Sequence, residues 1–434
     1  MSLWTSTADP AVAVSFTEAV RSNVPPGGGL YLPARLAPLP DVPRLLELGW
    51  LERAPALLRP LLGPEPPEAE LDALLADAFS FPAPLVEVRE DRFALELFHG
   101  PTLSFKDFGA RFLARFLAWA EARGGASPRR LVITATSGDT GSAVAQAFWG
   151  LPGFRVAVLY PRGRVSPLQE LQMATLGGNV RAFAVDGSFD DCQRLVKACF
   201  ADGALSADLG LTSANSINVA RLVAQVLYYF EAVAQLRRHL PAGPRPWIAV
   251  PSGNFGNLCA GLLAARLGLP LAGFVAATNA NRTVPDYLET GDYRPRPSLA
   301  TLSNAMDVGD PNNWQRISWL FGGEVEQLRR TLRWGSAGDP ETREALAELA
   351  ALGYAGDPHG AVAWHVLERS LGPGEVGIFL ATAHPAKFEA TAEAAGPVPA
   401  LAELARRPLL SEPLPNSLEL LRSELRAWRP EAAR

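Results

Sequence analysis

Short apolar runs alternate with amphipathic segments along most of the chain. The runs have the length of strands, and each is followed by a polar turn, often containing glycine, and then by a helical pattern. The expected strands are Leu131–Thr136, Phe154–Tyr160, Val180–Val185, Trp247–Val250, Phe274–Thr278 and Val376–Thr382. The expected helices are Ser142–Phe148, Pro167–Leu176, Asp190–Phe200, Ile217–Leu240 and Leu258–Leu267. Because buried parallel strands read as continuous apolar runs, the pattern predicts an α/β fold with mostly parallel sheets covered on both faces.

The two ends of the chain have a different pattern. The first 80 or so residues are predicted to form helices and turns, including a short helix over Val14–Val20 and an amphipathic helix over Glu68–Phe79. Leu85–Val88 and Phe93–Phe98 flank a polar turn and predict a hairpin. From about residue 400 the chain is predicted to be helical, with Asn416 as a helix cap and a glutamate three residues later.

The composition of the chain argues against several classes of function. The chain has 434 residues, 40 basic and 45 acidic side chains, a net charge of −5 and 48% apolar residues. A single core stops growing at roughly 250–300 residues, so we expect at least two lobes. Without a basic excess, a nucleic-acid partner is not expected. No apolar run reaches about 18 residues, so no membrane span is expected.

Cysteines, histidines and the start of the chain add to this picture. The three cysteines include no close CxxC pair, which fits neither a disulfide framework nor a zinc site. His359 and His365 have the wrong spacing to share a metal ion, and we expect no metal. The first seven residues lack the basic and apolar regions of a signal peptide. We therefore expect a soluble protein of the cytoplasm.

Lysine is rare in this chain. The 40 basic residues include only Lys106, Lys197 and Lys387. A primary amine can form an imine with a carbonyl, which a guanidinium cannot. Lys106 follows the turn Gly100-Pro101 and stands at a predicted helix start, where the helix dipole favours a neutral amine over a cation. A solvated lysine is the alternative. Lys197 is interpreted as a surface charge. Lys387 follows a strand exit, where ligands bind in α/β folds, so a simple surface charge is a weaker interpretation for it.

Two loops at predicted strand ends could bind anions. Thr136–Gly141 (TSGDTG) and Ser252–Asn257 (SGNFGN) each bring backbone N–H groups to a helix start. Turn chemistry alone explains many such loops. Together with Lys106, however, they predict an imine-forming amine, a phosphate site and a carboxylate site. A phosphate-bearing aldehyde cofactor that acts on an amino acid needs these three features.

Four motifs carry a specific resemblance to a known family. They are Glu96–Gly109 (ELFHGPTLSFKDFG), Thr136–Gly141, Pro251–Asn257 (PSGNFGN) and Ala381–Phe388 (ATAHPAKF). The chain resembles the bacterial and fungal branch of the threonine synthases, which are pyridoxal-phosphate enzymes of the tryptophan-synthase-β fold type. The likeness continues in the same order over most of the chain, for example through Ser213–Phe230 (SANSINVARLVAQVLYYF).

The resemblance implies a fold and a domain organisation. Fold type II of the pyridoxal-phosphate enzymes is α/β, with two open, mostly parallel sheets flanked by helices and, here, a helical N-terminal segment. We expect this segment over residues 1–84 and a catalytic region over 85–395. A smaller lobe, at about 121–212, is inserted in the larger one. A helical tail is expected over 396–434.

The resemblance also implies an activity. The expected cofactor is pyridoxal 5'-phosphate. The expected reaction converts O-phospho-L-homoserine and water to L-threonine and phosphate by γ-elimination and β-hydration. The protein would then be a lyase of threonine biosynthesis, and we expect a monomer or a homodimer.

Site residues follow from the same resemblance. Lys106 is expected to form the Schiff base with the cofactor. The other expected cofactor contacts are Gly253, Asn254, Phe255, Gly256, Asn257 and, at the pyridine nitrogen, Thr382. The expected substrate contacts are Thr102, Ser104, Thr136, Ser137, Gly138, Asp139, Thr140 and Arg221. Within this set, Thr136–Thr140 would grip the substrate carboxylate. Arg221 would bind the substrate phosphate unless it pairs with a carboxylate between the lobes.

Asp139 departs from the wider fold type. Many relatives carry an asparagine at this position, whose amide would donate to the phenolate oxygen of the cofactor. An ionised aspartate would repel that oxygen. We therefore expect Asp139 to be protonated or turned away.

Other functions share parts of this pattern. A serine/threonine dehydratase or a cysteine synthase typically has a glycine-only phosphate loop, whereas this loop contains Asn254 and Phe255. A non-catalytic protein of threonine-synthase type would be expected to have lost Lys106. A nucleotide-binding protein would need a GxGxxG motif, which Gly253–Gly256 does not match.

Overall fold

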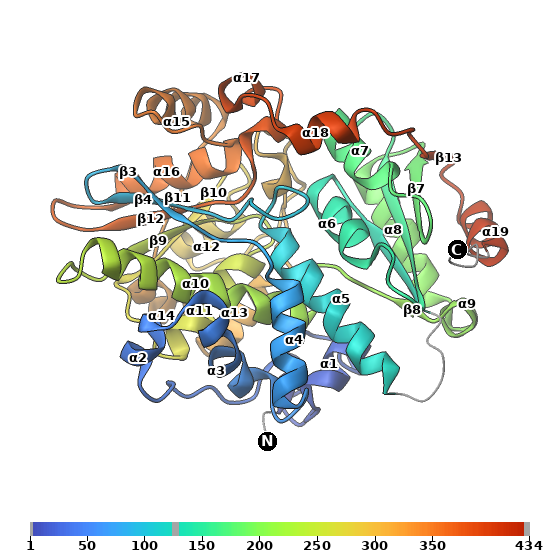
Figure 1. Ribbon diagram of the computed structural model, residues 1–434, viewed down its shortest axis with the longest axis horizontal. Helices are drawn as coiled ribbons and strands as arrows, with labels where there is room; N and C mark the ends of the chain where they lie inside the picture. The colour runs from blue at the N-terminus through green and yellow to red at the C-terminus, as the bar shows by residue number, and fades with distance from the viewer. Residues whose placement is uncertain (1–2, 124–129, 429–434) are drawn as a thin grey trace.

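Two open sheets with helices on both faces form the body of the molecule. The computed structural model describes residues 3–123 and 130–428. In Figure 1 the smaller sheet (green) lies to the right and the larger sheet to the left, and helix α5 (Lys106–Ala122, cyan) runs between them. The α/β architecture and the mostly parallel sheets confirm the prediction from the sequence.

The larger lobe is built on a six-stranded sheet. Its strand order is β11 (Leu332–Ser336), β10 (Gly273–Thr278), β9 (Trp247–Pro251), β12 (Gly377–Ala381), β4 (Arg92–Glu96) and β3 (Leu85–Arg89). All neighbours are parallel except β3 and β4, which form the predicted antiparallel hairpin. Strand β11 was not predicted, because its sequence LRWGS is only partly buried and has no apolar run.

Helices cover both faces of this sheet. Ile248 and Val250 of β9 belong to the cluster of buried residues around α10 (Val219–His239) and α11 (Gly256–Arg266), whereas Ala249 packs with α16 (Pro358–Ser370). Alternate residues of a strand face opposite sides, so these helices lie on opposite faces. The remaining helices of this lobe are α12 (Thr283–Thr290), η1 (Asn304–Met306), α13 (Trp314–Leu320), α14 (Val325–Thr331), α15 (Asp339–Ala351), η2 (Pro385–Lys387) and α17 (Ala392–Ala395).

The smaller lobe is built on a five-stranded sheet. Its order is β13 (Glu412–Leu414), β7 (Val180–Val185), β6 (Phe154–Pro161), β5 (Arg130–Ala135) and β8 (Leu211–Thr212), and all neighbours are parallel. The helices between these strands are α6 (Asp139–Phe148), α7 (Pro167–Ala174), α8 (Phe189–Ala201) and α9 (Gly203–Leu209). The predicted strands and helices of this region are confirmed to within a few residues.

The C-terminal tail differs from the prediction in two ways. It contains α18 (Pro399–Leu404) and α19 (Leu418–Ala427), but between them lies β13, which pairs with β7. This strand has only three residues, one of them a proline, so it left no apolar run to detect. The cap prediction was wrong by one residue. Ser417 caps α19, and the side-chain oxygen of Asn416 instead accepts a hydrogen bond from Arg194 (2.9 Å). The predicted tail beyond residue 428 lies outside the described residues.

The N-terminal segment packs against the larger lobe and α5. Its elements are β1 (Trp4–Ser6), α1 (Phe16–Ser22), β2 (Tyr31–Pro33), α2 (Val42–Glu47), α3 (Trp50–Leu62) and α4 (Glu68–Ala78). The ring of Trp4 is fully buried, and its indole N–H donates to the carbonyl of Leu61 (3.0 Å). The Phe16 ring contacts both Trp4 and Phe116 of α5. The two predicted helices, Val14–Val20 and Glu68–Phe79, correspond to α1 and α4.

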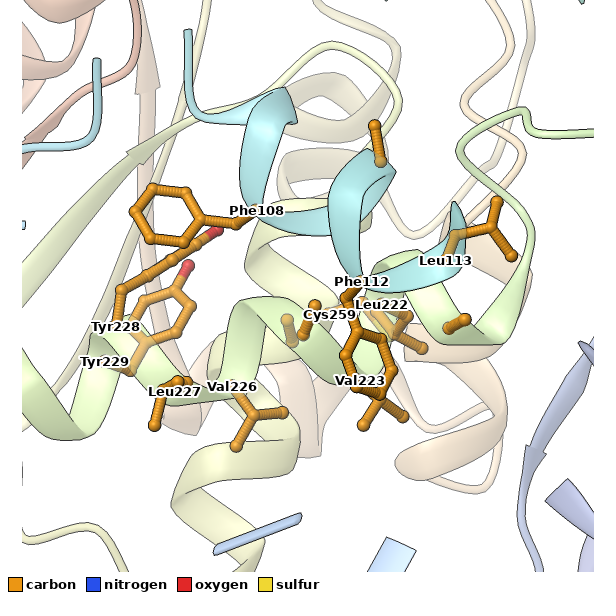
Figure 2. Close-up of a cluster of buried hydrophobic side chains, with 14 of the residues drawn as sticks. Phe108, Phe112, Leu113, Leu222, Val223, Val226, Leu227, Tyr228, Tyr229 and Cys259 are labelled. Atoms are coloured by element: carbon orange, nitrogen blue, oxygen red, sulfur yellow. The ribbon is translucent and has the colours of Figure 1, made fainter. Parts of the chain in front are cut away.

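Helices α5, α10 and α11 form the centre of the core. Figure 2 shows Phe108 and Phe112 of α5 above the side chains of α10, with Cys259 of α11 beside them. Phe108, Phe112 and Tyr228 are fully buried, and the rings of Phe108 and Tyr228 meet edge to face. This packing fixes α5, whose first residue is Lys106. In the described ranges, every helix is too short or too polar to cross a membrane.

We predict that Phe112→Ala lowers the free energy of unfolding by about 3–5 kcal/mol, because it leaves a cavity in this core. Leu420→Ala, at a position that is 45% exposed, serves as the control and should change it by less than about 0.5 kcal/mol. Chemical denaturation followed by fluorescence would measure both values. Similar effects of the two substitutions would show that the α5–α10 contact is not a centre of stability.

Candidate active site

Four strand exits meet between the two sheets. Three follow β9, β12 and β4, which are neighbours in the larger sheet, and one follows β5 of the smaller sheet. The exits after β4 and β12 are joined by backbone hydrogen bonds, from the N–H of Phe105 to Thr382 (2.8 Å) and from the N–H of His384 to Leu103 (3.0 Å). Ligands of α/β folds bind at such carboxyl ends, so this junction is the candidate active site.

Lys106 begins α5, as the sequence predicted. Its side chain is 13% exposed, and its Nζ lies 3.6 Å from Oδ2 of Asp139. Desolvation lowers the pKa of Lys106, and the charges of Lys387 and Arg221 act in the same direction, while Asp139 opposes them. A lysine with a lowered pKa has a larger neutral fraction, and this is the form that acts as nucleophile and base.

Asp139 stands in the first turn of α6 and is buried. Its Oδ1 lies 2.7 Å from Nζ of Lys387 and accepts a hydrogen bond from Gln169 (3.0 Å). Burial by itself raises the pKa of Asp139, but Lys387, Lys106 and the Gln169 bond outweigh it and hold the pKa well below its usual range. This lowered pKa argues against a protonated Asp139, and its carboxylate lies beside Lys387 and Lys106. The expectation that it turns away from the cofactor oxygen stays a prediction.

Lys387 is a site residue that the sequence left unassigned. It ends η2, just beyond β12, and its side chain has no exposed surface. Besides Asp139, its ammonium group contacts the carbonyl of Thr102, to which it donates at 2.7 Å. The available signal was the scarcity of lysine in this chain. Lys197, by contrast, is exposed, as predicted.

Every polar group of Thr102 forms a hydrogen bond. Its N–H and hydroxyl donate to the two carboxylate oxygens of Asp107 (2.8 and 2.7 Å). Its carbonyl accepts from Lys387 and from Gln172 (3.0 Å). Burial raises the pKa of Asp107 to about 6, and the bonds from Thr102 work against this rise. Thr102 thus connects Lys387 to the residue that follows Lys106.

Ser104 and Thr382 lie on the two joined exits and are both buried. Ser104 forms an isolated antiparallel bridge with Ala383, the neighbour of Thr382. The hydroxyl of Ser104 is buried and has no hydrogen-bond partner in the part of the chain that the structure describes. Since buried polar atoms are normally paired, this hydroxyl is available to a ligand.

The loop Thr136–Gly141 is partly used by its own side chains. The hydroxyl oxygen of Thr136 accepts from the N–H groups of Gly138 and Gly141 (both 2.9 Å). The N–H groups of Asp139 and Thr140 lie in the first turn of α6. A helix provides no backbone acceptors for the N–H groups of its first turn, so these two are left for other acceptors. Gly138 has φ +142°, and a Cβ there would lie 2.3 Å from the side chain of Gln169. This loop therefore requires glycine at 138.

The loop after β9 is held in place by its side chains. The carbonyl oxygen of the Asn254 amide accepts from the N–H of Asn312 (2.6 Å), and its NH₂ group donates to Ser216. Phe255 adopts a left-handed conformation (φ 57°) before α11 starts at Gly256. A Cβ at Gly253 would lie 2.7 Å from Cα of Met306, so the backbone of η1 lies directly against the loop.

Asn257 offers a free donor at the start of α11. Its Oδ1 accepts from the hydroxyls of Tyr228 (2.5 Å) and Tyr229 (2.6 Å). With the amide in this orientation, its Nδ2 is buried and has no partner among the described residues. The NH₂ group can therefore donate to an acceptor on a ligand. A helix start with a free buried donor is suited to a phosphate group.

Arg221 lies in the first turn of α10 and is 3% exposed. Its Nη1 donates to the carbonyl of Ala214 (2.8 Å), and its buried Nε has no partner among the residues that the structure describes. Desolvation lowers the pKa of Arg221 to about 10. Within residues 3–123 and 130–428 no carboxylate forms an ion pair with it, which removes the alternative of a pair between the lobes and leaves the guanidinium available to an anion.

A metal centre is not found in the described ranges, where no group of three His, Cys, Asp or Glu side chains could hold an ion. His359 instead contacts Asp357 through Nδ1 (2.8 Å) and accepts from the N–H of Ala305 through Nε2 (3.2 Å). Cys192, Cys199 and Cys259 are buried and free.

Comparisons with known proteins identify the family of the chain. Residues 81–382 match the family described as pyridoxal-phosphate dependent enzymes, and residues 360–424 match the C-terminal region of threonine synthase. A threonine synthase of Haemophilus influenzae is 49% identical over 421 residues, covering 96% of this chain and 97% of that protein.

Solved structures give the same result. The crystal structure of threonine synthase from Escherichia coli has a TM-score of 0.90 and 47% identity, covering 98% of this chain and 99% of that chain. A threonine synthase from Brucella melitensis, solved with pyridoxal phosphate bound, has a TM-score of 0.92 and 34% identity, with coverage of 98% and 99%. The chain therefore belongs to the pyridoxal-phosphate dependent enzymes and, within them, to the threonine synthases.

Proposed function

We propose that this enzyme converts O-phospho-L-homoserine and water to L-threonine and phosphate. The observation that carries the proposal is the position of Lys106, a largely buried amine with a lowered pKa, at a junction of two loops that are suited to anions. The named relatives, which are threonine synthases, support it.

The loop after β9 fits the phosphate of pyridoxal phosphate. We propose that Gly253, Asn254, Phe255, Gly256 and Asn257 hold this group at the start of α11. The free Nδ2 of Asn257 and the close approach allowed by Gly253 support this assignment. Asn254 would contribute through its backbone, because its side chain is already bonded to Asn312 and Ser216.

Bound pyridoxal phosphate supplies an aldehyde for the substrate amine and a ring that withdraws electrons from the substrate α-carbon. The protein supplies the proton transfers. The neutral amine of Lys106 is suited to remove the α-proton and to move protons at the neighbouring carbons. We propose that the hydroxyl of Thr382 faces the ring nitrogen, where a neutral partner would moderate the electron withdrawal.

The substrate would be held at both of its anionic ends. We propose that its carboxylate binds at Thr136–Thr140, through the N–H groups of Asp139 and Thr140, with Ser137 and Gly138 shaping the loop. The free hydroxyl of Ser104 is a further candidate contact, and Thr102 would act through its bonds to Asp107 and Lys387. Arg221 would bind the substrate phosphate and stabilise it as it leaves.

The alternative functions are those of a dehydratase and of a non-catalytic protein. The match to the C-terminal region of threonine synthase and the presence of Lys106 support catalysis of the threonine synthase reaction. We further infer a cytoplasmic monomer or homodimer, and the three buried free cysteines support a reducing compartment.

We predict that Lys106 carries the cofactor. Borohydride reduction of the purified protein and peptide mapping should place the pyridoxyl group on the peptide that contains Lys106. Lys106→Arg should abolish the visible absorbance of the bound cofactor, because a guanidinium cannot form the imine. A label on Lys197 or Lys387 would contradict the assignment.

We predict that Gly253→Ala weakens binding of pyridoxal phosphate at least about tenfold. Its Cβ would meet backbone atoms of Met306 and Ala305 (2.7 and 2.9 Å), which cannot turn away as a side chain can, so the loop must shift. Gly203→Ala is a matched control, since a Cβ there meets nothing within 4 Å. Titration of the cofactor followed by absorbance would compare the variants, and equal affinities would argue against this loop as the phosphate site.

We predict that Arg221→Ala reduces kcat/KM for O-phospho-L-homoserine by a factor that corresponds to about 2–4 kcal/mol. Binding of an amino acid that lacks the phosphate should change far less, because in this proposal the guanidinium contacts only the phosphate group of the substrate. Arg237→Ala, at an exposed position of the same helix, is the control. Equal losses for both ligands would identify Arg221 as a structural residue.

A further inference from the structure

Two lysines share one buried carboxylate at the junction of the lobes. Lys387 ends η2 of the larger lobe, and Asp139 starts α6 of the smaller lobe. The ammonium of Lys387 lies 2.7 Å from Oδ1 of Asp139, whereas that of Lys106 lies 3.6 Å from Oδ2. The side chains of Lys387 and Asp139 are 0% and 2% exposed, so water screens this interaction little.

The two lysines are not equivalent. Lys387 has a second acceptor, the carbonyl of Thr102 at 2.7 Å, and that carbonyl is held in turn by Gln172. Lys106 has only the longer contact with Asp139 among its ion pairs in the described chain. If all three groups are charged, the cluster carries a net positive charge, which is unfavourable in a buried site. Loss of the proton from Lys106 makes the cluster neutral and leaves the shorter ion pair intact.

We propose that Lys387 is a positioning residue that pairs with the charge of Asp139 and so leaves Lys106 as a neutral amine. The functional meaning of this proposal rests on the proposed role of Lys106 in binding the cofactor. The alternative is that Lys387 only joins the two lobes.

The charges that face Lys106 come from three elements. They are Asp139 on α6, Lys387 on η2 and Arg221 on α10. On α5 itself, Asp107 accepts hydrogen bonds from Thr102, and the charge of Lys387 acts to lower the pKa of Asp107. Removal of the charge of Lys387 leaves the carboxylate of Asp139 with Lys106 as its nearest cation. The protonated form of Lys106 would then be favoured, and its pKa would rise.

The scarcity of lysine makes a direct test possible. The full chain, freed of cofactor, is labelled with trace acetic anhydride at a series of pH values, and mass spectrometry follows Lys106 separately from Lys197 and Lys387. In Lys387→Met the midpoint of Lys106 labelling should move upward by about one pH unit or more, which is about a tenfold loss of reactivity at neutral pH. Lys197, which is exposed, is the internal control and should not move.

Two further variants separate charge from structure. Lys387→Gln keeps a hydrogen-bond donor without the charge and should give the same upward shift, while Lys387→Arg keeps the charge and should stay near the original midpoint. A folded neutral variant, verified by circular dichroism, whose Lys106 midpoint is unchanged or lower would overturn the proposal. This outcome is distinct from failure of the proposed function, which the borohydride mapping of the cofactor-loaded protein tests separately.

Discussion

The ion pair between Lys387 and Asp139 is the contact on which the candidate site depends. It connects the exit of β12 in the larger lobe to the start of α6 in the smaller lobe, and both partners are buried. Removal of one partner would leave a buried charge without compensation, a change that commonly costs several kcal/mol. The same contact determines how much negative charge is left for Lys106. In our proposal, this one ion pair therefore joins the two lobes and also influences the reactivity of Lys106.

Two donors at the junction lack partners. The Nε of Arg221 and the Nδ2 of Asn257 are buried and form no hydrogen bond with any described residue. Donors of this kind are costly unless a ligand satisfies them. A cofactor phosphate and a phosphorylated amino acid would provide the acceptors. The junction thus offers buried donors that anionic ligands can satisfy.

The sequence predicted most of this fold and part of the site. Apolar runs gave most strands of the two sheets, although not β8, β11 or β13, and Lys106 lies at a helix start as expected. Strand β13 escaped detection because three residues with a proline have no periodicity. The lowered pKa of Asp139 could not be inferred, since its partner Lys387 is distant in the chain and only the tertiary fold brings them together. The same holds for the contacts of Tyr228 and Tyr229 with Asn257.

The position of β13 has a consequence for the order of assembly. This strand forms one edge of the smaller sheet, and Arg181 of β7 binds Glu412 and Glu424 of the tail. The lobe that includes residues 130–212 is therefore incomplete until the segment that contains β13 has left the ribosome. Pairing between such distant segments is slow, because a long loop must close first. During synthesis, the outer edge of β7 is an unpaired strand edge, and such edges favour aggregation until the tail covers them.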